Sequence, residues 1–354
     1  MKKILIDLSI LKHIDCGLGQ VAYNYAKYFE KNAGSMDFEV HLLVPKRYVG
    51  AFGKDVHYHI SNKIYTIFPF LFPKFDLWHS IHQLSRFKPS RRSTKQILTI
   101  HDINFIYEKR GLKREKYAQY FEKKIQRADR LVSISQFTRT DVMKHFPTDK
   151  PITVIYNGVE FSPVSSGTMP DIPVLTEKKF LFSIGQIRWK KNFHVMLDAM
   201  KLMPEYNLII SGSVSTDYAE MIRKRIADEK IENIFLTGNI KHSEKVWLYA
   251  HCEAFVFPSL FEGFGLPVIE VMSFGKPVIS SDKTSLKEIG SNHVFFLKNF
   301  QPEHIAEKIR EAIDSYKKNP KMVTENENYA KGFTYDNHMA SYISIYRELL
   351  MLST

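Results

Sequence analysis

Short runs of apolar residues alternate with amphipathic stretches along nearly the whole chain. In the first half, the runs that predict strands lie at 4–11, 38–44, 76–80, 96–102, 130–135 and 152–158. In the second half, they lie at 179–185, 206–212, 233–238, 254–259 and 276–281. Helical periodicity separates them at 19–31, 112–128, 192–203, 216–229, 243–250 and 266–274. This alternation is typical of parallel sheets covered by helices, so we predict an α/β fold.

A stretch rich in proline, serine and glycine divides the two series. It covers residues 161–179 and has the composition of a linker. We therefore predict a first Rossmann-like domain at 1–165, a second at 166–332, and a last amphipathic helix within 333–354. Two such domains leave a cleft between them, where ligands usually bind.

The composition excludes several classes of protein. Of the 354 residues, 44% are hydrophobic and 25% are charged, which is the profile of a globular chain rather than a disordered one. Asp7 interrupts the first apolar run, so this run predicts a buried strand and not a signal peptide. No apolar stretch reaches the roughly 18 residues of a membrane-spanning helix. Cys16 and Cys252 are too few for a disulfide framework, which favours a reducing compartment such as the cytoplasm.

The formal charge of +12 is concentrated in the first half of the chain. Residues 1–172 hold 27 Lys and Arg against 16 Asp and Glu, while the remainder holds 23 against 22. Such asymmetry indicates a partner, which is a nucleic acid, an anionic membrane surface or an anionic substrate. The alternative is a well-solvated basic surface without a partner. The basic run 88–95 lacks the interleaved aromatic residues of a nucleic-acid-binding surface, so we expect no nucleic-acid partner. A nucleic-acid-binding protein is kept as an alternative function because of the basic charge.

The densest chemical signal lies at 258–282, in the sequence PSLFEGFGLPVIEVMSFGKPVISSD. A strand ends near Pro258, a glycine-bearing loop follows, and Pro267 fits the first turn of a helix. Free N–H groups at the start of a helix suit a phosphate. Glu262 lies in the loop and Glu270 in the helix, and carboxylates accept hydrogen bonds from sugar hydroxyls. Together these features indicate a nucleotide sugar.

This segment resembles the signature of glycosyltransferase family 4, whose members are retaining enzymes of the GT-B fold. Other matching pieces follow in the family's order, namely CGLGQVAYN (16–24), TIHDINF (99–105), SISQFTRTDV (133–142), VIYNGVE (154–160), SIGQIRWKKNFHVML (183–197), LTGNIKHSEKVWLYAHCEAFVFPS (236–259) and TSLKEIG (284–290). The resemblance thus covers nearly the whole chain. It implies two Rossmann-like domains facing across a cleft, with the last helix crossing back to the first domain.

The resemblance implies a role for each matching residue. Glu262 would hydrogen-bond the transferred sugar, Glu270 would hold the ribose, and His101 would contact the donor sugar. Arg188 and Lys191 would stabilise the leaving diphosphate. The other donor-binding positions would be Gly17, Gly19, Gly185, Lys190, Gly238, Ile240 and the backbone N–H groups of Phe264, Gly265 and Leu266.

The sequence departs from the family at Gln186, where members often carry an arginine. Arg188 would then supply that charge from a different position. The resemblance also implies transfer with retention, without a metal ion or a cofactor, in which a donor phosphate oxygen accepts the acceptor's proton. The histidines show no spacing typical of metal ligands. The sequence does not decide whether His79 and His82 line the cleft or lie in the core. For His101, the alternative to a donor contact is a position in the core.

Gly17 and Gly19 leave another alternative open. Glycines here let the backbone approach a phosphate or an acceptor closely. The sequence GLGQVA (17–22) is also a permitted variant of the dinucleotide fingerprint, so an NAD-dependent dehydrogenase is an alternative on this segment alone. That alternative accounts for none of the motifs in the second half.

The resemblance leans toward the mannosyltransferase-like branch of the family. GDP-mannose is then the favoured donor, and a UDP-sugar is the second choice. The acceptor would be a saccharide or a lipid-linked saccharide on the basic first domain, in the synthesis of a cell-surface polysaccharide. The sequence leaves the linkage and the oligomeric state open.

An aromatic segment at 64–78 makes an anionic membrane a candidate partner. Two prolines, Pro69 and Pro73, argue against a regular buried helix. Basic residues flank the segment at Lys63, Lys74, Arg86, Lys88, Arg91, Arg92 and Lys95. Cations around an apolar patch suit the inner face of an anionic bilayer, where a lipid-linked acceptor would lie. This hypothesis expects Phe70 and Phe72 to be exposed, whereas the alternative places these aromatics in the core.

Overall fold

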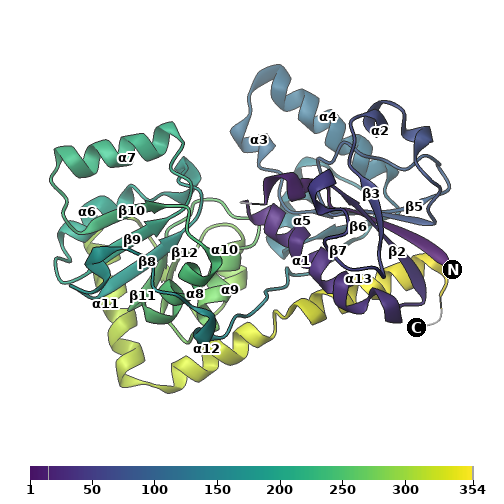
Figure 1. Cartoon of the computed structure of the whole chain (residues 1–354). Coiled ribbons are helices and arrows are strands. Elements are labelled where there is room, and N and C mark those ends of the chain that lie inside the picture. The colour runs from purple at the N-terminus through teal and green to yellow at the C-terminus, as the bar shows by residue number, and fades with distance from the viewer. Residues whose placement is uncertain (15, 353–354) are drawn as a thin grey trace. The chain divides into compact units, whose positions relative to one another are not determined.

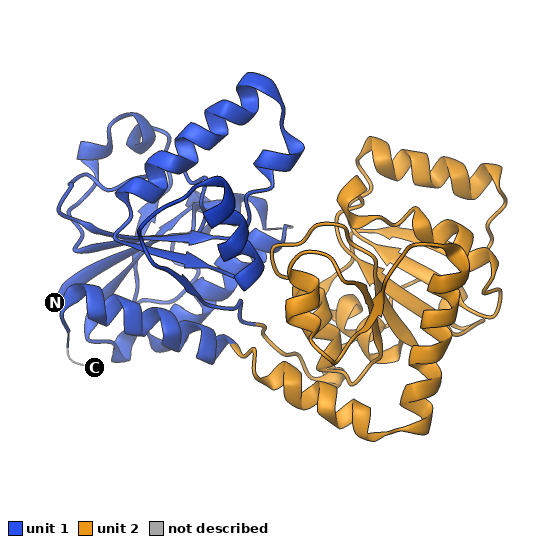
Figure 2. Ribbon diagram, turned by 180° about the vertical axis from the view of Figure 1, so that it is seen from behind, with its two compact units in different colours: residues 1–158, 335–354 blue, residues 159–334 orange. Residues whose placement is uncertain are grey.

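Two parallel sheets, each with its own helices, divide the chain into two units. The computed structural model describes residues 1–14 and 16–352 (Figure 1). Unit 1 comprises Met1–Gly158 with Tyr335–Thr354, and unit 2 comprises Val159–Thr334 (Figure 2). The units thus divide at 158/159 and 334/335, where the sequence suggested 165 and 332. The last two residues of the predicted segment 333–354 lie outside the described part of the chain.

Unit 1 is built on a parallel sheet. Its strands in residues 1–14 and 16–352 are β1 (Lys2–Asp7), β2 (Phe38–Val44), β3 (His57–Ile60), β4 (Leu77–Ser80), β5 (Lys95–Ile100), β6 (Arg130–Ser133) and β7 (Ile152–Val154). They lie in the order β3-β2-β1-β4-β5-β6-β7, and each neighbouring pair is parallel. The helices are α1 (Gly17–Asn32), α2 (Ile64–Ile67), α3 (Phe105–Glu108), α4 (Gly111–Arg127), α5 (Gln136–His145) and α13 (Tyr335–Leu350). Short 3₁₀ helices cover Ser9–His13, Ala33–Ser35, Lys46–Tyr48 and Pro69–Leu71.

Burial in the first strand follows its amino-acid pattern. Lys2 and Lys3 are exposed, whereas the next residues, Ile4 to Ile6, are fully buried. Consecutive buried apolar residues are expected where helices cover both faces of a parallel sheet. The neighbouring helix α1 buries one stripe of side chains, spaced as a helix face requires, at Val21, Ala22, Tyr25, Ala26 and Phe29.

The last helix, α13, packs on unit 1, which confirms the predicted return of the chain (Figure 1). His79 of β4 lies 2.6 Å from the Tyr346 hydroxyl through Nδ1 and 2.8 Å from Thr99 Oγ1 through Nε2. Thr99 Oγ1 in turn lies 2.9 Å from the Tyr342 hydroxyl. All four side chains are buried, and mutual hydrogen bonds offset the cost of removing their polar atoms from water. His79 therefore anchors α13 and lines no open cleft.

Unit 2 carries a second parallel sheet. In the described residues its strands are β8 (Phe180–Ile184), β9 (Asn207–Ser211), β10 (Ile234–Gly238), β11 (Ala254–Phe257), β12 (Val278–Ser281) and β13 (Phe295–Leu297), in the order β10-β9-β8-β11-β12-β13. The helices are α6 (Val195–Lys201), α7 (Asp217–Asp228), α8 (His242–His251), α9 (Leu266–Met272), α10 (Ser285–Gly290), α11 (Pro302–Lys318) and α12 (Lys321–Lys331). Short 3₁₀ helices cover Val164–Ser166, Pro173–Leu175 and Trp189–Lys191.

Two strands, β3 and β13, were absent from the sequence prediction. Both lie at the edge of their sheet. The residues of β3 are all exposed or half-buried, and its sequence HYHI has no continuous apolar run. An edge strand pairs on one side only, so burial imposes less of a pattern on its sequence.

The aromatic segment 64–78 is divided between surface and core. Phe70 is 70% exposed, as the membrane hypothesis expects. The expected exposure of Phe72 is wrong, because Phe72 is only 4% exposed. Its ring stacks on Tyr65 at 4.1 Å and meets Trp78 edge-on at 5.3 Å. Among the described residues, no helix is both long enough and apolar enough to cross a membrane.

Acidification is expected to destabilise unit 1 before unit 2. Burial lowers the pKa of the unit 1 histidines His82 and His338 to about 4 and of His101 to about 3. A histidine with a lower pKa in the folded state binds fewer protons there. Its stabilising contribution is therefore complete above the unfolded pKa near 6.5 and is lost as pH falls toward 4, by about 1.4 kcal/mol per pH unit for each histidine.

Hydrogen exchange followed by mass spectrometry between pH 7 and about pH 4, corrected for the intrinsic exchange rate, measures this loss for each unit. Loss of protection in unit 2 at the same or a higher pH would contradict the expectation.

Candidate active site

The predicted donor residues gather at one edge of the unit 2 sheet. The order of the strands reverses between β8 and β11, and open parallel sheets bind ligands outside the carboxyl ends of the strands at such a point. Gly185 directly follows β8, the loop 258–265 follows β11, and Thr284 follows β12. A backbone hydrogen bond of 2.7 Å from Leu260 N–H to the Lys190 carbonyl joins the first two segments.

Lys191 and Glu262 form an ion pair at this edge. Lys191 Nζ lies 2.6 Å from Glu262 Oε1, and the side chains are 12% and 15% exposed. Limited contact with water strengthens their attraction relative to that of an exposed pair. Lys191 Nζ also lies 4.6 Å from the centre of the Phe257 ring. The fold thus brings together two of the predicted catalytic residues, 71 positions apart in the sequence.

Glycines make room for this pair. A Cβ on Gly185 would lie 2.9 Å from Lys191 Cε, and Gly185 has a φ of +149°. A Cβ on Gly212 would lie 2.0 Å from the Gly185 carbonyl oxygen. The Gly212 N–H donates to the Gly238 carbonyl at 2.8 Å, and Ile240 beyond it is half-buried. The sequence analysis assigned no role to Gly212, whose signal was a glycine at the end of the predicted strand 206–212.

Hydrogen bonds from the next loop fix the backbone around Glu262. The Glu262 N–H donates to Thr284 Oγ1 at 3.0 Å. The buried Ser285 hydroxyl lies 2.9 Å from the Glu262 carbonyl and 3.0 Å from the Phe264 carbonyl. Thr284 has a φ of +53°, which a β-branched residue rarely adopts. Strain of this kind persists where the surroundings hold a functional loop in place.

The loop ends at Gly265, where α9 begins. Gly265 has a φ of +107°, and a Cβ there would lie 2.7 Å from Leu286 Cδ2. Leu266 and Pro267 then form the first turn of the helix, as the sequence predicted. Glycine is therefore required here both for the backbone angle and for the contact with α10.

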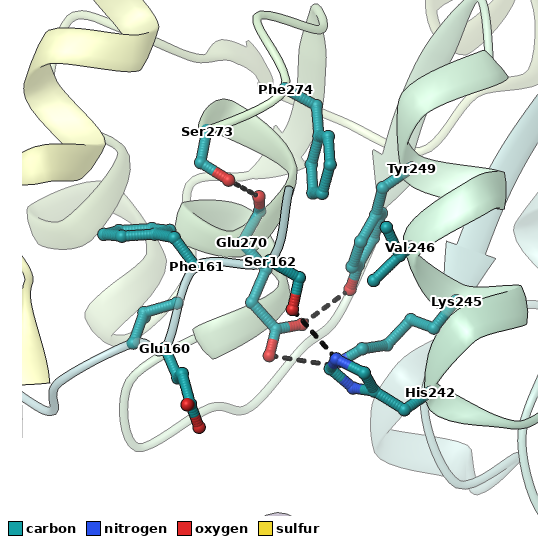
Figure 3. Close-up of a pocket in the computed structure, with 11 residues that line it drawn as sticks. Glu160, Phe161, Ser162, His242, Lys245, Val246, Tyr249, Glu270, Ser273 and Phe274 are labelled. Atoms are coloured by element: carbon teal, nitrogen blue, oxygen red, sulfur yellow. Dashed lines mark hydrogen bonds and ion pairs between the residues drawn. The ribbon is translucent and has the colours of Figure 1, made fainter. Parts of the chain in front are cut away.

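Glu270 lies in a small hollow about one helical turn further along the chain (Figure 3). Its carboxylate accepts a hydrogen bond of 2.9 Å from the Tyr249 hydroxyl and lies 3.0 Å from Lys245 Nζ. Burial and the Glu270 charge raise the pKa of Tyr249 well above its usual value, so its hydroxyl stays a donor. The hollow is lined by Val159, Glu160, Phe161, Ser162, His242, Lys245, Val246, Tyr249, Glu270, Ser273 and Phe274.

Three polar side chains of the hollow come from α8. Lys245 and Tyr249 are four residues apart and so share one face of the helix. His242, at the start of the helix, lies 2.9 Å from Ser162 Oγ through Nε2 (Figure 3). Burial and the nearby charge of Lys245 lower the pKa of His242. The sequence analysis used the stretch 236–259 only as a match to the family and predicted no role for these residues, although the i, i+4 spacing of Lys245 and Tyr249 is visible in the sequence.

The remaining cations of the site lie beside the ion pair. Arg188 is exposed, and within the described part of the chain its guanidinium forms no ion pair. Lys190 is half-buried, and its carbonyl holds the loop after β11. Between them Trp189 is 61% exposed and stacks on His194 at 4.8 Å. Arg188 is therefore accessible to an anionic ligand.

In unit 1, His101 follows β5 and is neutral. Burial and the neighbouring His82 lower its pKa to about 3. Its Nε2 donates to the Ile81 carbonyl at 2.9 Å, which leaves Nδ1 as an acceptor. The Gln83 side chain accepts from the His101 N–H at 3.2 Å. His101 can therefore accept a hydrogen bond at neutral pH, but it carries no charge.

The two early glycines differ from each other. A Cβ on Gly19 would lie 2.1 Å from the His13 carbonyl oxygen, so packing within unit 1 already requires glycine there. Gly17 is exposed, and a Cβ on it would meet nothing within 4 Å. Donor binding by either glycine stays a prediction, as it does for Gly238 and Ile240.

Replacing Gly185 by alanine is expected to damage the site more than the fold. The new Cβ would press on the flexible end of Lys191 and move its ammonium away from Glu262. Gly50→Ala is the matched control, because Gly50 has a φ of +81° and open space around its Cβ position. Both variants should lose about 1 to 2 kcal/mol of stability.

Only Gly185→Ala should lose affinity for a nucleoside diphosphate in titration calorimetry. Equal affinity in the two variants would contradict this role.

Two family profiles match the sequence. The one described as Glycosyltransferase Family 4 matches residues 16–162, and the one described as Glycosyl transferases group 1 matches residues 168–329. The chain is 26% identical over 246 residues to O-antigen chain mannosyltransferase RfbU of Salmonella typhimurium, covering 68% of this chain and 66% of that protein. It is 28% identical over 218 residues to O-antigen chain mannosyltransferase B of Escherichia coli, covering 56% of each. The matched region thus spans less than two thirds of either relative.

Solved structures share the fold at low sequence identity. The glycosyltransferase from Rickettsia africae ESF-5 gives a TM-score of 0.75 at 17% identity, over 99% of both chains. Anabaena Alr3699/HepE in complex with UDP-glucose gives 0.74 at 17% identity, over 97% of this chain and 100% of that one. With the two parallel sheets, these likenesses confirm the predicted GT-B fold. The profiles over both units and the shared fold show that the chain belongs to glycosyltransferase family 4.

Proposed function

We propose that the protein transfers a hexose from a nucleotide diphosphate sugar to a saccharide or lipid-linked saccharide acceptor, in the synthesis of a cell-surface polysaccharide. The observation that carries the proposal is the Lys191–Glu262 pair at the point where the strand order of unit 2 reverses. A cation that would bind the diphosphate lies there beside a carboxylate that would bind the sugar. The names of the related mannosyltransferases support mannose as the sugar, and hence GDP-mannose as the donor.

The diphosphate would be bound by the cations after β8. Arg188 is exposed and Lys191 already lies at the sheet edge, so both can meet a phosphate oxygen. Negative charge grows on the diphosphate as the sugar–phosphate bond breaks, and fixed cations stabilise that charge. Gln186 is uncharged, so Arg188 would replace the arginine common in the family.

The nucleoside would lie against Glu270. Lys245 and Tyr249 both bind this carboxylate, which fixes its direction. The two oxygens of a carboxylate can accept hydrogen bonds from two neighbouring hydroxyls, such as the 2′ and 3′ hydroxyls of a ribose. Phe161 and Phe274 provide apolar walls to the same hollow.

Transfer would proceed without a protein nucleophile. Glu262 would orient the hydroxyls of the sugar, while a phosphate oxygen of the donor accepts the proton of the attacking hydroxyl on the same face. The protein contributes positioning and fixed charges, which are large terms in such reactions. His101 would act as a neutral hydrogen-bond acceptor, because its low pKa removes a cationic role at neutral pH.

Substitution of Glu262 and of Glu270 should affect opposite ends of the donor, the sugar and the nucleotide. Glu262→Ala should lower transfer by about a hundredfold or more and leave nucleotide affinity nearly unchanged, because its partner is the sugar. Glu270→Ala should weaken nucleotide binding by about 1.5 to 3 kcal/mol through the lost ribose contacts. Titration calorimetry of GDP and UDP against both variants, with the exposed Glu232→Ala as control, measures the difference and identifies the base.

Equal loss of nucleotide affinity in Glu262→Ala and Glu270→Ala would overturn the assignment of the two ends. Absence of binding to any nucleoside diphosphate or its sugar would overturn the proposed function itself.

We also propose that unit 1 binds an anionic membrane surface. The exposed apolar patch consists of Ile64, Ile67, Phe68, Phe70 and Leu71, which are 45%, 68%, 44%, 70% and 48% exposed. Exposed cations lie on both sides in the sequence, at Lys63, Lys74, Arg86, Lys88, Arg91 and Arg92. The loop 86–92 lies beside the segment 64–73, since Ser90 Oγ donates to the Pro73 carbonyl and the Phe87 ring meets that of Phe72 edge-on. Apolar side chains among cations suit an anionic lipid surface.

Phe70→Asp should reduce sedimentation with phosphatidylglycerol liposomes at least tenfold, because burial of one aromatic side chain is worth about 2 kcal/mol. High salt should release the unmodified protein, since the cations supply the remaining attraction. Leu112→Asp is the control, because Leu112 is 84% exposed in unit 1 but lies outside the patch. Equal effects of the two substitutions, or no sedimentation of the unmodified protein at low salt, would contradict membrane binding.

A further inference from the structure

Side chains of types that bind metal ions gather at the edge of the unit 1 sheet, outside the candidate active site. Glu39 and His41 lie on β2, and His57 and His59 lie on the edge strand β3. The register places His41 opposite His57. Residues two apart on a strand point to the same face, so parallel pairing puts all four side chains on one face.

Three of these side chains present ligand atoms to a common point. One ligand atom each from Glu39, His41 and His57 lies within 4.8 Å of the others. Glu39 Oε2 is 3.3 Å from His41 Nε2 and 4.0 Å from His57 Nε2. In a tetrahedral site with metal–ligand bonds of about 2.0 to 2.1 Å, neighbouring ligand atoms lie about 3.3 to 3.5 Å apart. Rotation of the exposed His57 side chain and of the Glu39 carboxylate would close the set to that geometry.

Packing holds the His41 ring in place. The rings of His41 and His57 are stacked, with their centres 4.6 Å apart. Phe75 meets the rings of His41 and His59 at 5.2 and 5.3 Å. His41 is buried, whereas the His57 side chain is 60% exposed, so the point between the ligands is open to solvent. A metal ion could therefore enter and keep a water molecule as its fourth ligand.

We propose that Glu39, His41 and His57 bind one divalent transition-metal ion, with Zn²⁺ as the expected occupant. Two imidazole nitrogens and one carboxylate oxygen are a ligand set that Zn²⁺ accepts, and Ca²⁺ and Mg²⁺ prefer oxygen ligands alone. The three ligands come from adjacent strands, so no metal-ligand spacing exists in the sequence.

His59 acts on the site through His41. His59 Nε2 lies 3.0 Å from His41 Nδ1. When the metal binds His41 Nε2, the proton of the neutral ring resides on Nδ1, and Nδ1 donates it to His59 Nε2. His59 then carries its own proton on Nδ1, so both rings stay neutral. A partner of this kind fixes the orientation of a metal-ligating histidine.

The bound ion would fasten the edge of the sheet. Strand β3 pairs only with β2 among the described strands, and α2, which begins at Ile64, is the next element in the chain. A metal that joins Glu39 and His41 to His57 would tie β3 to β2 through side chains as well as backbone. Its binding energy to the folded state would appear as added stability of unit 1.

Lys3 is the competing cation. Its Nζ lies 3.8 Å from Glu39 Oε2, and its side chain is 48% exposed. The metal would replace this contact, and Lys3 would turn to solvent. Lys3→Ala should therefore bind the metal as tightly as the unmodified protein or more tightly, whereas removal of a ligand should weaken binding.

The test is titration of the full-length chain, free of any histidine tag, with Zn²⁺ by calorimetry and with Co²⁺ by visible absorption. We expect one ion per chain and the intense visible bands of a four-coordinate Co²⁺ site. His57→Ala and Glu39→Gln should each abolish these bands, and His59→Ala should weaken binding about 10- to 100-fold. His13→Ala is the matched control, because His13 is an exposed histidine of unit 1 outside the cluster.

The thermal unfolding of unit 1 should shift upward with Zn²⁺ in the unmodified protein and in His13→Ala, but not in His57→Ala. His57 is exposed, so its loss should leave the metal-free fold intact, and an unchanged melting temperature without metal would verify this. Binding that survives both His57→Ala and Glu39→Gln, or the absence of a four-coordinate Co²⁺ spectrum in the unmodified protein, would overturn the proposal. Neither result would bear on the nucleotide site of unit 2.

Discussion

The parallel direction of the strands is the constraint on which the rest of the structure depends. Within the part of the chain that the structure describes, each sheet pairs its strands in parallel, so every carboxyl end lies at the same edge. In unit 2 the order reverses between β8 and β11, and the helices that follow these two strands leave on opposite faces. The loops they open therefore diverge, and the space between them receives Lys191 and Glu262.

At the carboxyl ends of the unit 2 strands, neighbouring turns lie in close contact. This contact explains residues for which the chemistry of the site alone gives no reason. Gly212 lets the turn after β9 contact the turn after β8, and Gly185 leaves room for Lys191. Thr284 accepts an unfavourable backbone angle while its hydroxyl holds the Glu262 N–H. Such strain costs about 1 to 3 kcal/mol and persists only where the surrounding contacts exceed it. The geometry of the ion pair thus depends on uncharged neighbours.

Histidine shows how one residue type takes its role from its neighbours. His79 is fully buried and joins the sheet to α13, while His101 is neutral beside the Ile81 carbonyl. His41 and His57 lie together on an edge strand pair with a carboxylate between them. These histidines are indistinguishable in the sequence, because burial and hydrogen-bond partners come from segments up to 267 positions away.

The sequence by itself determined two things. It revealed the strands and helices whose burial requires a regular pattern of apolar residues, and it revealed the family to which the chain belongs. Central strands such as β1 and β11 are buried on both faces, so their apolar runs were visible, and the motif 258–282 carried the site's chemistry. Only the tertiary structure decided which distant side chains meet. It paired Lys191 with Glu262, enclosed Glu270 with Lys245 and Tyr249, buried Phe72 and brought histidines of β2 and β3 together. The physical reason is that strand register and loop contacts bring together residues that are distant in the sequence, and such contacts leave no local pattern in it. Edge strands are only partly buried, so their sequences lack the apolar runs that reveal buried strands.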